Sequence, residues 1–274
     1  MRVGMPVGVR VGVRAVLGGR YDRYAWEPVT AGMSGAAVWR LGAELYLKVG
    51  PGVAAEAERC AWLAGYGLPA PEVVEHGIDE EHGEWVLSAA LAGRSAAEPW
   101  PAGQRAGVVD ALADLARALH GLPVGECPFD RSLAVTLPLA RAAVADGSAE
   151  AEGVEDPAGL LARLEAGWPA EGGPVARHEG LRVLEEDLAV CHGDFCLPNV
   201  LLDPVSLRVT GVIDLGRLGV ADRAADLGLM TRSLADGRLN PQYGAAGAAR
   251  FLDRYGGAVA EQRLAYYREL DLLA

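Results

Sequence analysis

Residues 192–199 read HGDFCLPN and residues 213–217 read IDLGR. Short apolar runs bounded by turn residues flank both stretches and predict strands joined by a tight hairpin. In this arrangement Asp194 follows one strand, Asn199 precedes the next, and Asp214 ends the returning strand. Because a hairpin brings its two ends together, we expect the side chains of Asp194, Asn199 and Asp214 to converge.

The residue types of this cluster indicate metal-assisted phosphoryl transfer. A carboxylate and an amide oxygen suit Mg²⁺, which binds nucleotides through their phosphates, and a further carboxylate remains to orient a hydroxyl group. The same chemistry needs a phosphate-binding cation, which Lys48 in the strand-like LYLKV supplies, and an acid on the next helix to hold it, for which Glu56 and Glu58 are candidates. It also needs backbone N–H groups over the phosphates, and the turn at 32–35 fits.

The pattern along the chain predicts an α+β protein with a β-rich first third. Apolar alternation predicts strands at 45–49 and 84–90, separated by a helix at 54–65 that Gly65 closes. A long amphipathic helix follows at 102–120, and most of the remainder is helical. The expected parts are an N-terminal extension (1–21), a nucleotide-binding lobe (22–91) and a catalytic lobe (92–274).

Composition narrows the class of protein and of partner. The 274 residues are 51% hydrophobic and 23% charged, which is typical of a globular domain, and the net charge is −12. This charge disfavours a nucleic-acid partner and suits a small cationic substrate. Four cysteines without CxxC spacing do not indicate zinc, and the lack of a long apolar run argues against a membrane span. We expect a cytoplasmic monomer.

These motifs resemble those of the aminoglycoside O-phosphotransferases. The matching segments are VCHGDxCxPN and VTGxIDLGRLGxADR, and the resemblance extends over residues 22–274. It implies a protein-kinase-like fold of two lobes, a small β-rich N-lobe and a larger, mainly helical C-lobe, with ATP and Mg²⁺ as cofactors. It also implies that Asp194 is catalytic, that Asn199 and Asp214 bind Mg²⁺, and that Lys48 contacts the nucleotide phosphates.

The same resemblance assigns further nucleotide contacts. The Glu that holds the lysine lies six residues before a Trp in this family, which selects Glu56 over Glu58. Tyr46, two residues before the lysine, is expected to stack on adenine, and Ser34 to reach a phosphate. The linker from Ser88 to Ala90 is expected to offer backbone hydrogen bonds to the adenine base.

The resemblance implies an aminoglycoside substrate, and two hydroxyl groups compete as the acceptor. The chain ends LDLLA where kinases of the 3′-hydroxyl of kanamycin or neomycin end LDE[LF]F, so Leu272 replaces an acid that binds the drug. The catalytic loop resembles the HGDxCMPN form of streptomycin 3″-kinases, whereas residues 127–136 resemble actinomycete 3′-kinases. We expect streptomycin, with the 3′-hydroxyl as the alternative. The expected substrate contacts are Asp194, Glu155, Asp156, Arg217, Asp226 and Asp271.

A protein of a different class carries some of the same features. A kinase-like module without catalytic activity would bind a cation and release it unchanged. Such a module typically lacks one of the four residues Lys48, Asp194, Asn199 and Asp214, and this chain has them all. We therefore expect an enzyme.

Overall fold

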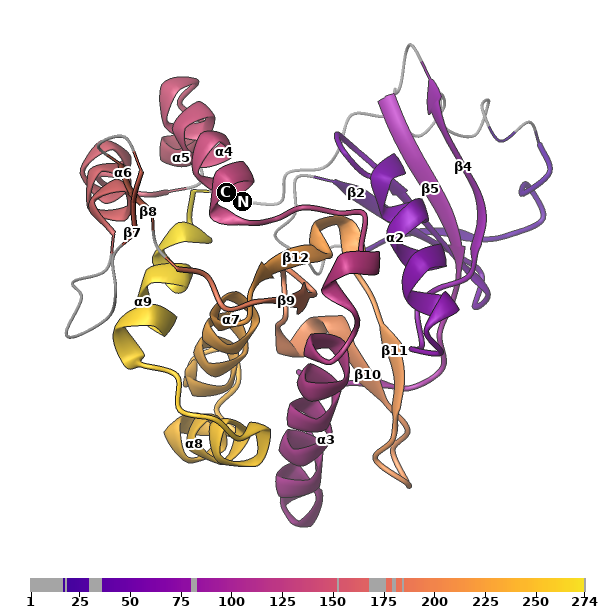
Figure 1. Ribbon diagram of the computed structural model, residues 1–274. Coiled ribbons are helices and arrows are strands. Elements are labelled where there is room, and N and C mark those ends of the chain that lie inside the picture. The colour runs from indigo at the N-terminus through magenta and orange to yellow at the C-terminus, as the bar shows by residue number, and fades with distance from the viewer. Residues whose placement is uncertain are drawn as a thin grey trace. The chain divides into compact units, whose positions relative to one another are not determined.

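The computed structural model describes residues 17, 19–29, 36–79, 83–151, 153–167, 176–178, 181–183 and 185–273. The chain forms two compact units, drawn in Figure 1. Unit 1 contains the chain up to Gly93 together with Thr210–Gly216, and unit 2 contains Arg94–Val209 and Arg217 onward. The IDLGR stretch is therefore divided, with Asp214 in unit 1 and Arg217 in unit 2.

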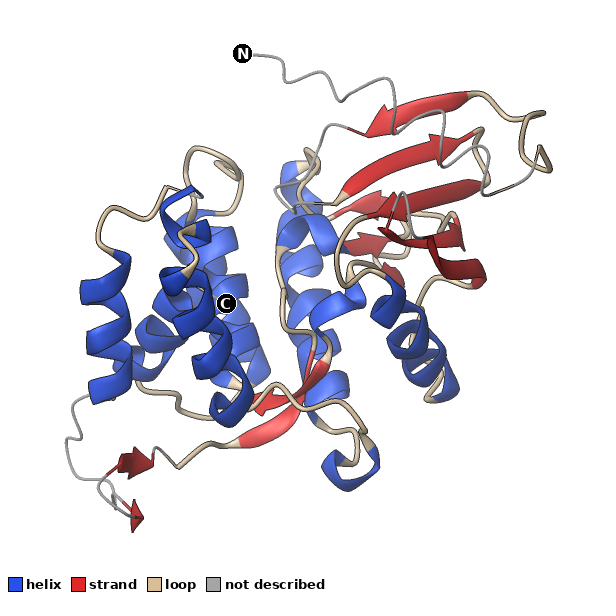
Figure 2. Ribbon diagram, turned by 90° about the horizontal axis from the view of Figure 1, so that it is seen from above, coloured by secondary structure: helices blue, strands red, loops and turns tan. Residues whose placement is uncertain are grey.

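Unit 1 is built on a five-stranded antiparallel sheet in the order β1-β2-β3-β5-β4, whose strands are red in Figure 2. The predicted strand at 45–49 and the predicted helix at 54–65 are confirmed, and β5 begins one residue before the predicted 84–90. The elements are β1 (Trp26–Val29), β2 (Ala37–Leu41), β3 (Leu45–Val49), α2 (Ala54–Gly65), β4 (Val73–Asp79) and β5 (Gly83–Ala89).

Side-chain alternation in β3 separates the core face of the sheet from the face that carries Lys48. Leu45, Leu47 and Val49 are buried, whereas Tyr46 and Lys48 between them point to the opposite face and are half-buried. The core face packs Leu47 with Trp39, Leu41, Trp85, Leu87 and Leu17. Leu17 lies in the predicted N-terminal extension (1–21), yet it is part of this core.

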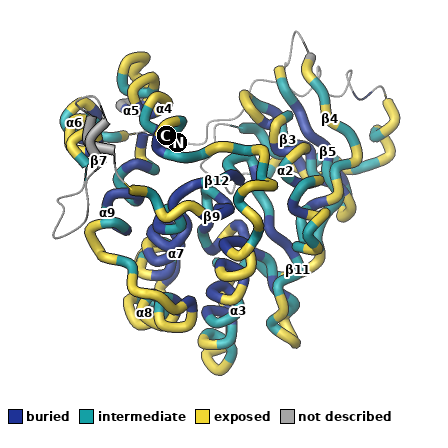
Figure 3. The backbone as a smooth tube through the Cα atoms, viewed as in Figure 1, coloured by how far each residue is buried: buried dark blue, intermediate teal, exposed yellow. Residues whose placement is uncertain are grey.

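Unit 2 is mainly helical, as predicted, and the α+β fold class is confirmed. Helix α7 packs against α8 and α9, and α3 packs against α8. Figure 3 shows the buried residues of α7 in dark blue. The helices are α3 (Ala102–His120), α4 (Leu133–Ala145), α5 (Ser148–Ala151), α6 (Pro157–Ala166), α7 (Ala224–Ala235), α8 (Gly244–Tyr255) and α9 (Glu261–Leu270).

The remaining strands are short, and two of them, β9 and β10, flank the candidate catalytic loop of unit 2. β9 pairs antiparallel with β12, β10 with β6, and β7 with β8. Their bounds, with β11 and the 3₁₀ turns, are β6 (Arg94–Ser95), η1 (Val124–Glu126), β7 (Ala176–His178), β8 (Leu181–Val183), β9 (Leu188–Cys191), η2 (Leu197–Asn199), β10 (Val200–Leu202), β11 (Val209–Val212), η3 (Leu215–Arg217) and β12 (Gly219–Asp222).

Helix α4 shows where sequence patterning fails. Pro138 lies in its interior and normally argues against a helix, because proline has no N–H group and clashes with the preceding turn. Pro138 is exposed, while Leu133, Thr136 and Ala140 form the buried face. Water can therefore hydrate the carbonyl group that loses its partner, and burial of the opposite face maintains the helix.

No helix in the described ranges combines the length and the apolar composition needed to cross a bilayer.

Replacing Leu47 by alanine should destabilise unit 1 by about 2–5 kcal/mol, because this side chain is fully buried and its removal leaves a cavity. Ile78→Ala is the control, since Ile78 is 78% exposed and its loss should cost less than about 0.5 kcal/mol. Denaturant unfolding followed by the fluorescence of the core tryptophans Trp39 and Trp85 measures both changes. Equal costs for the two variants would contradict the described core.

Candidate active site

Three charged side chains of unit 1 form one ion-pair network. Lys48 Nζ lies 2.9 Å from Glu56 Oε2 and 2.6 Å from Asp214 Oδ1. The second oxygen of Glu56 accepts the backbone N–H of Leu215 at 3.0 Å. Glu56 therefore holds both the lysine and the segment that carries Asp214. Glu58, the other candidate from the sequence, is exposed.

The packing of α2 explains why this network forms. Ala57 and Val53 pack on Val86, which is the cross-strand neighbour of Lys48 in β5. Helix α2 therefore covers the sheet face that carries Lys48, and Glu56 in its first turn points toward the lysine. Glu56 is buried, so its carboxylate needs the two donors that it receives.

The network keeps Lys48 positively charged. Burial lowers the pKa of the Lys48 ammonium, but the charges of Glu56 and Asp214 outweigh burial and raise this pKa above its ordinary value. Lys48 is therefore a cation across the physiological pH range. One cation between two carboxylates leaves local negative charge, which favours the approach of a divalent metal ion.

The other residues assigned to the nucleotide lie on or near the same sheet. Tyr46 is on the Lys48 face of β3 and is the cross-strand neighbour of Ser88. The backbone N–H of Ala90 donates to the carbonyl oxygen of Glu44 at 2.7 Å, so an adenine base would have to share or replace that bond. Ser34 lies outside the described residues.

Asp194 and Asn199 form a second cluster, in unit 2. Asn199 Nδ2 donates to Asp194 Oδ2 and to the Asp194 carbonyl oxygen, both at 2.9 Å. The backbone N–H of Asp194 donates to His192 Nδ1 at 3.2 Å. These bonds fix the Asp194 side chain at the turn between β9 and η2 and leave it partly accessible. The convergence of this cluster with Asp214 stays a prediction.

Asp226 anchors this loop from α7, and the expectation that it contacts substrate is wrong. Its carboxylate is fully buried and accepts the backbone N–H groups of His192 at 2.7 Å and Gly193 at 2.9 Å. Burial alone would raise the pKa of Asp226, but hydrogen bonding to His120, the nearby His120 and His192 side chains and the His192 N–H outweigh burial and lower it. A substrate cannot reach a carboxylate enclosed in this way.

Asp271 lies between two arginines, one of which the sequence analysis did not identify. Arg217 Nη1 is 3.0 Å from Asp271 Oδ1, and Arg232 Nη2 is 2.5 Å from Oδ2. Arg217 and Asp271, both expected to contact substrate, thus contact each other. Arg232 lies in α7 outside any motif, so only the fold reveals its role. A cationic substrate would meet an Asp271 carboxylate that is already neutralised.

Glu155 and Asp156, both expected to contact substrate, lie just before α6. Their surroundings differ. Asp156 caps α6 by accepting the N–H of Gly159 at 2.9 Å, whereas Glu155 is exposed. Both line a hollow of about 480 Å³ in unit 2, and residues near the C-terminus line it as well. Its lining consists of Gly153, Val154, Glu155, Asp156, Leu160, Arg163, Glu269 and Leu272.

Gly193→Ala should destabilise unit 2 by at least about 2 kcal/mol, because Gly193 has a φ of +84° and a Cβ there would collide with the carbonyl oxygen of Arg217. Gly237→Ala is the matched control, since a Cβ at Gly237 meets nothing within 4 Å. Thermal unfolding of both variants measures the difference. A Gly193→Ala protein as stable as the control would show that the loop has room for a side chain.

Comparisons with known proteins identify relatives of this chain. The family model described as the phosphotransferase enzyme family matches residues 25–270. An aminoglycoside 3′-phosphotransferase of Streptomyces fradiae is 43% identical over 92% of this chain and 96% of its own length. A streptomycin 3″-kinase of Streptomyces griseus is 40% identical over 90% of this chain and 92% of its own length.

Solved structures agree with these relatives. A type VIII aminoglycoside-3′-phosphotransferase superposes with a TM-score of 0.84 at 46% identity, over 98% of this chain and all of the other. The phosphotransferase APH(3″)-Id of Streptomyces rimosus, in complex with ADP and streptomycin, superposes with a TM-score of 0.73 at 31% identity, over 98% of this chain and 99% of the other. The family match and the two-part α+β architecture together assign the kinase-like fold, and this chain belongs to the phosphotransferase enzyme family.

Proposed function

We propose that this protein transfers the γ-phosphoryl group of MgATP to a hydroxyl group of an aminoglycoside. The observation that carries the proposal is the ion-pair network of Lys48, Glu56 and Asp214, in a chain 43% identical to an aminoglycoside 3′-phosphotransferase. A partly buried lysine held by two carboxylates is the arrangement that phosphoryl transfer from ATP uses to bind phosphates. The net charge of −12 favours a cationic substrate.

Asp194 is the proposed catalytic residue. Its carboxylate would accept a hydrogen bond from the substrate hydroxyl and orient that oxygen toward the γ-phosphorus. Asn199 and the backbone of the loop fix the carboxylate, so little entropy remains to be lost when the substrate binds. Because the transition state of phosphoryl transfer is loose, this positioning matters more than the basicity of Asp194.

Asn199 and Asp214 are the proposed Mg²⁺ ligands, and their surroundings fit that role. Asn199 Nδ2 donates a hydrogen bond to Asp194 Oδ2. This contact occupies the amide nitrogen and leaves the amide oxygen as the proposed ligand atom. Asp214 binds Lys48 through Oδ1, so Oδ2 is its second oxygen. Both are hard oxygen donors of the kind Mg²⁺ requires. The bound ion would neutralise charge on the phosphate oxygens.

Lys48, Tyr46 and the Ser88–Ala90 linker are the proposed nucleotide contacts, with Ser34 as a further phosphate contact. The complex of the S. rimosus relative with ADP supports the use of an adenine nucleotide. We further propose that the enzyme acts in the cytoplasm, where ATP is available, and that it acts as a monomer. No role for a nucleic acid or a membrane is proposed.

The 3″-hydroxyl of streptomycin is the first candidate acceptor. It is supported by the S. griseus kinase and by the streptomycin complex of the S. rimosus relative. The pairing of Asp271 with Arg217 and Arg232, together with Leu272 at the position of a second acid, weakens the amine site that a 3′-kinase needs. The 3′-hydroxyl of a kanamycin-type or neomycin-type drug is the second candidate, favoured by the higher identity to 3′-phosphotransferases.

The mass of the drug after incubation with MgATP tests this function. The purified protein is incubated separately with streptomycin and with kanamycin. We expect streptomycin to gain the mass of one phosphoryl group. A gain on kanamycin alone would transfer the assignment to the 3′-hydroxyl. If neither drug gains mass, both acceptors are excluded and the substrate class is reopened. A protein that binds MgATP but consumes none with any aminoglycoside would be a non-catalytic binding module.

Asp194→Asn should lower kcat by at least about 100-fold, because a neutral amide cannot accept the hydroxyl proton and orients that group poorly. ATP binding should survive. Lys48 is the only lysine in the chain, so protection of its amino group by MgATP from an acylating reagent, which reacts with the neutral amine, reports nucleotide binding.

The control for this experiment is Asp253→Asn, which removes an exposed carboxylate of α8 and should leave kcat unchanged. An Asp194→Asn protein that keeps most of its kcat would remove Asp194 from the catalytic role. Loss of Lys48 protection in the same variant would show instead that the substitution disturbs nucleotide binding.

A further inference from the structure

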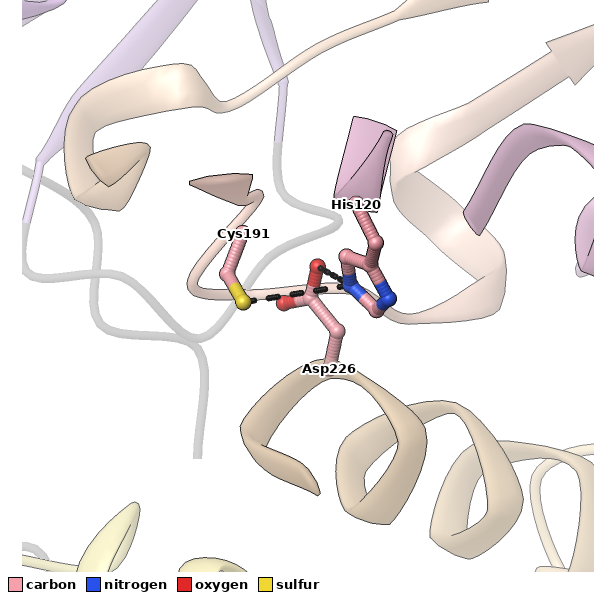
Figure 4. Close-up of side chains that lie close together, drawn as sticks. All are labelled: His120, Cys191 and Asp226. Carbon is pink, nitrogen blue, oxygen red and sulfur yellow. Dashed lines mark hydrogen bonds and ion pairs between the residues drawn. The ribbon is translucent and has the colours of Figure 1, made fainter. Parts of the chain in front are cut away.

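Unit 2 encloses a cluster of three potential metal ligands that the proposed reaction does not use. His120 ends α3, Cys191 ends β9 and Asp226 lies in the first turn of α7, and Figure 4 shows their side chains pointing toward one another. All three residues are buried. They form the only such group found in the described part of the chain.

Two separations within the cluster lie close to those of ligands around zinc, and all its ligand atoms lie within 4.8 Å of one another. His120 Nε2 lies 3.3 Å from Asp226 Oδ2 and 3.8 Å from Cys191 Sγ. Zinc bonds of about 2.0–2.1 Å to nitrogen or oxygen and about 2.3 Å to sulfur, at tetrahedral angles, place neighbouring ligand atoms about 3.3–3.7 Å apart. For the two pairs that include His120, a cation of this size needs only small movements of the side chains.

The charges of the cluster also suit a divalent cation. A thiolate from Cys191, the carboxylate of Asp226 and a neutral His120 ring sum to two negative charges. A divalent ion makes this set electrically neutral, and neutrality is what a buried site requires. Thiolate and imidazole ligands select zinc-like, thiophilic ions over Mg²⁺, so the cofactor of the reaction does not compete.

The other ring nitrogen of His120 has the outer partner that a metal-binding histidine needs. Tyr255 Oη lies 2.9 Å from His120 Nδ1. With the ring proton on Nδ1, the imidazole donates to this hydroxyl group and presents the Nε2 lone pair to the cluster. Such a partner orients the ring and fixes its tautomer in metal sites.

We propose that His120, Cys191 and Asp226 form a buried inhibitory site for a thiophilic divalent cation of the zinc class. When the ion binds, the Cys191 thiol releases its proton to solvent, and the single proton of the neutral His120 ring shifts from Nε2 to Nδ1. The cation then occupies the position that this proton held between Nε2 and Oδ2. Because the ligands are buried, entry requires local opening and binding is slow.

Inhibition follows because Asp226 also holds the backbone of the loop that carries Asp194. Its Oδ2 atom also accepts the N–H of His192 at 2.7 Å, two residues before Asp194. A cation that shares this oxygen withdraws charge from the hydrogen bond and loosens the loop that carries Asp194. This coupling to activity depends on the proposed function, whereas the binding of the ion does not.

A cadmium titration tests the binding without any assay of activity. Cd²⁺ substitutes for Zn²⁺ and gives an ultraviolet charge-transfer band when a thiolate binds it. We expect one slowly appearing band in the native protein and in Cys127→Ser, whose thiol lies outside the cluster. The band should be lost in Cys191→Ser. In His120→Gln, the affinity of the protein for Cd²⁺ should fall at least about tenfold.

A band that survives in Cys191→Ser would assign the ion to another cysteine and overturn the site, as would the absence of any band. Circular dichroism of each variant verifies that it is folded. Loss of the band in a folded Cys191→Ser protein together with its retention in Cys127→Ser supports the proposal.

The activity arm compares the native protein with Cys191→Ser after preincubation with Zn²⁺, at a constant excess of Mg²⁺. We expect a slow loss of phosphotransferase activity in the native protein alone. Ion binding without loss of activity would overturn the inhibition and leave the site. A native protein that binds the ion but phosphorylates no drug even without it would refute the proposed function, since the cadmium band reports the site independently.

Discussion

The buried carboxylate of Asp226 is the constraint on which the candidate catalytic loop depends. A charge removed from water must be compensated by donors, and Asp226 receives the N–H groups of His192 and Gly193 and contacts the His120 ring. Each of these donors is fixed by backbone or by packing, so the loop has one arrangement that satisfies the charge. The position of Asp194 thus follows from an interaction that Asp194 does not itself make.

Unit 1 also contains a partly buried charge, which is compensated by two carboxylates. Lys48 is partly buried, and Glu56 and Asp214 keep it charged. Glu56 also binds the backbone of Leu215, so the helix, the strand and the returning segment are joined by one carboxylate. The residual negative charge favours a metal ion and the lysine favours a phosphate, which together are the requirements of a bound metal–nucleotide complex.

Much of the fold could be predicted because its elements carry strong local patterns. The strand at 45–49 and the helices at 54–65 and 102–120 have the bounds that alternation, glycine and proline indicated. Helix α4 was not predicted, because the penalty of Pro138 is offset by burial of the opposite face, which no local pattern displays. Strand β4 was also missed, because it is stabilised by pairing with β5 rather than by an apolar period of its own.

The sequence by itself determined the chemistry of the protein, because reactive residue types at fixed spacing, such as HGD with Asn199, need no knowledge of packing. Only the tertiary structure decided which charges are available. It enclosed Asp226 beneath the loop and joined Asp271 to Arg217 and Arg232, although all these residues look alike as exposed charges in a sequence. The physical reason is that burial and ion pairing depend on neighbours remote in the chain, whereas the intrinsic reactivity of a side chain does not.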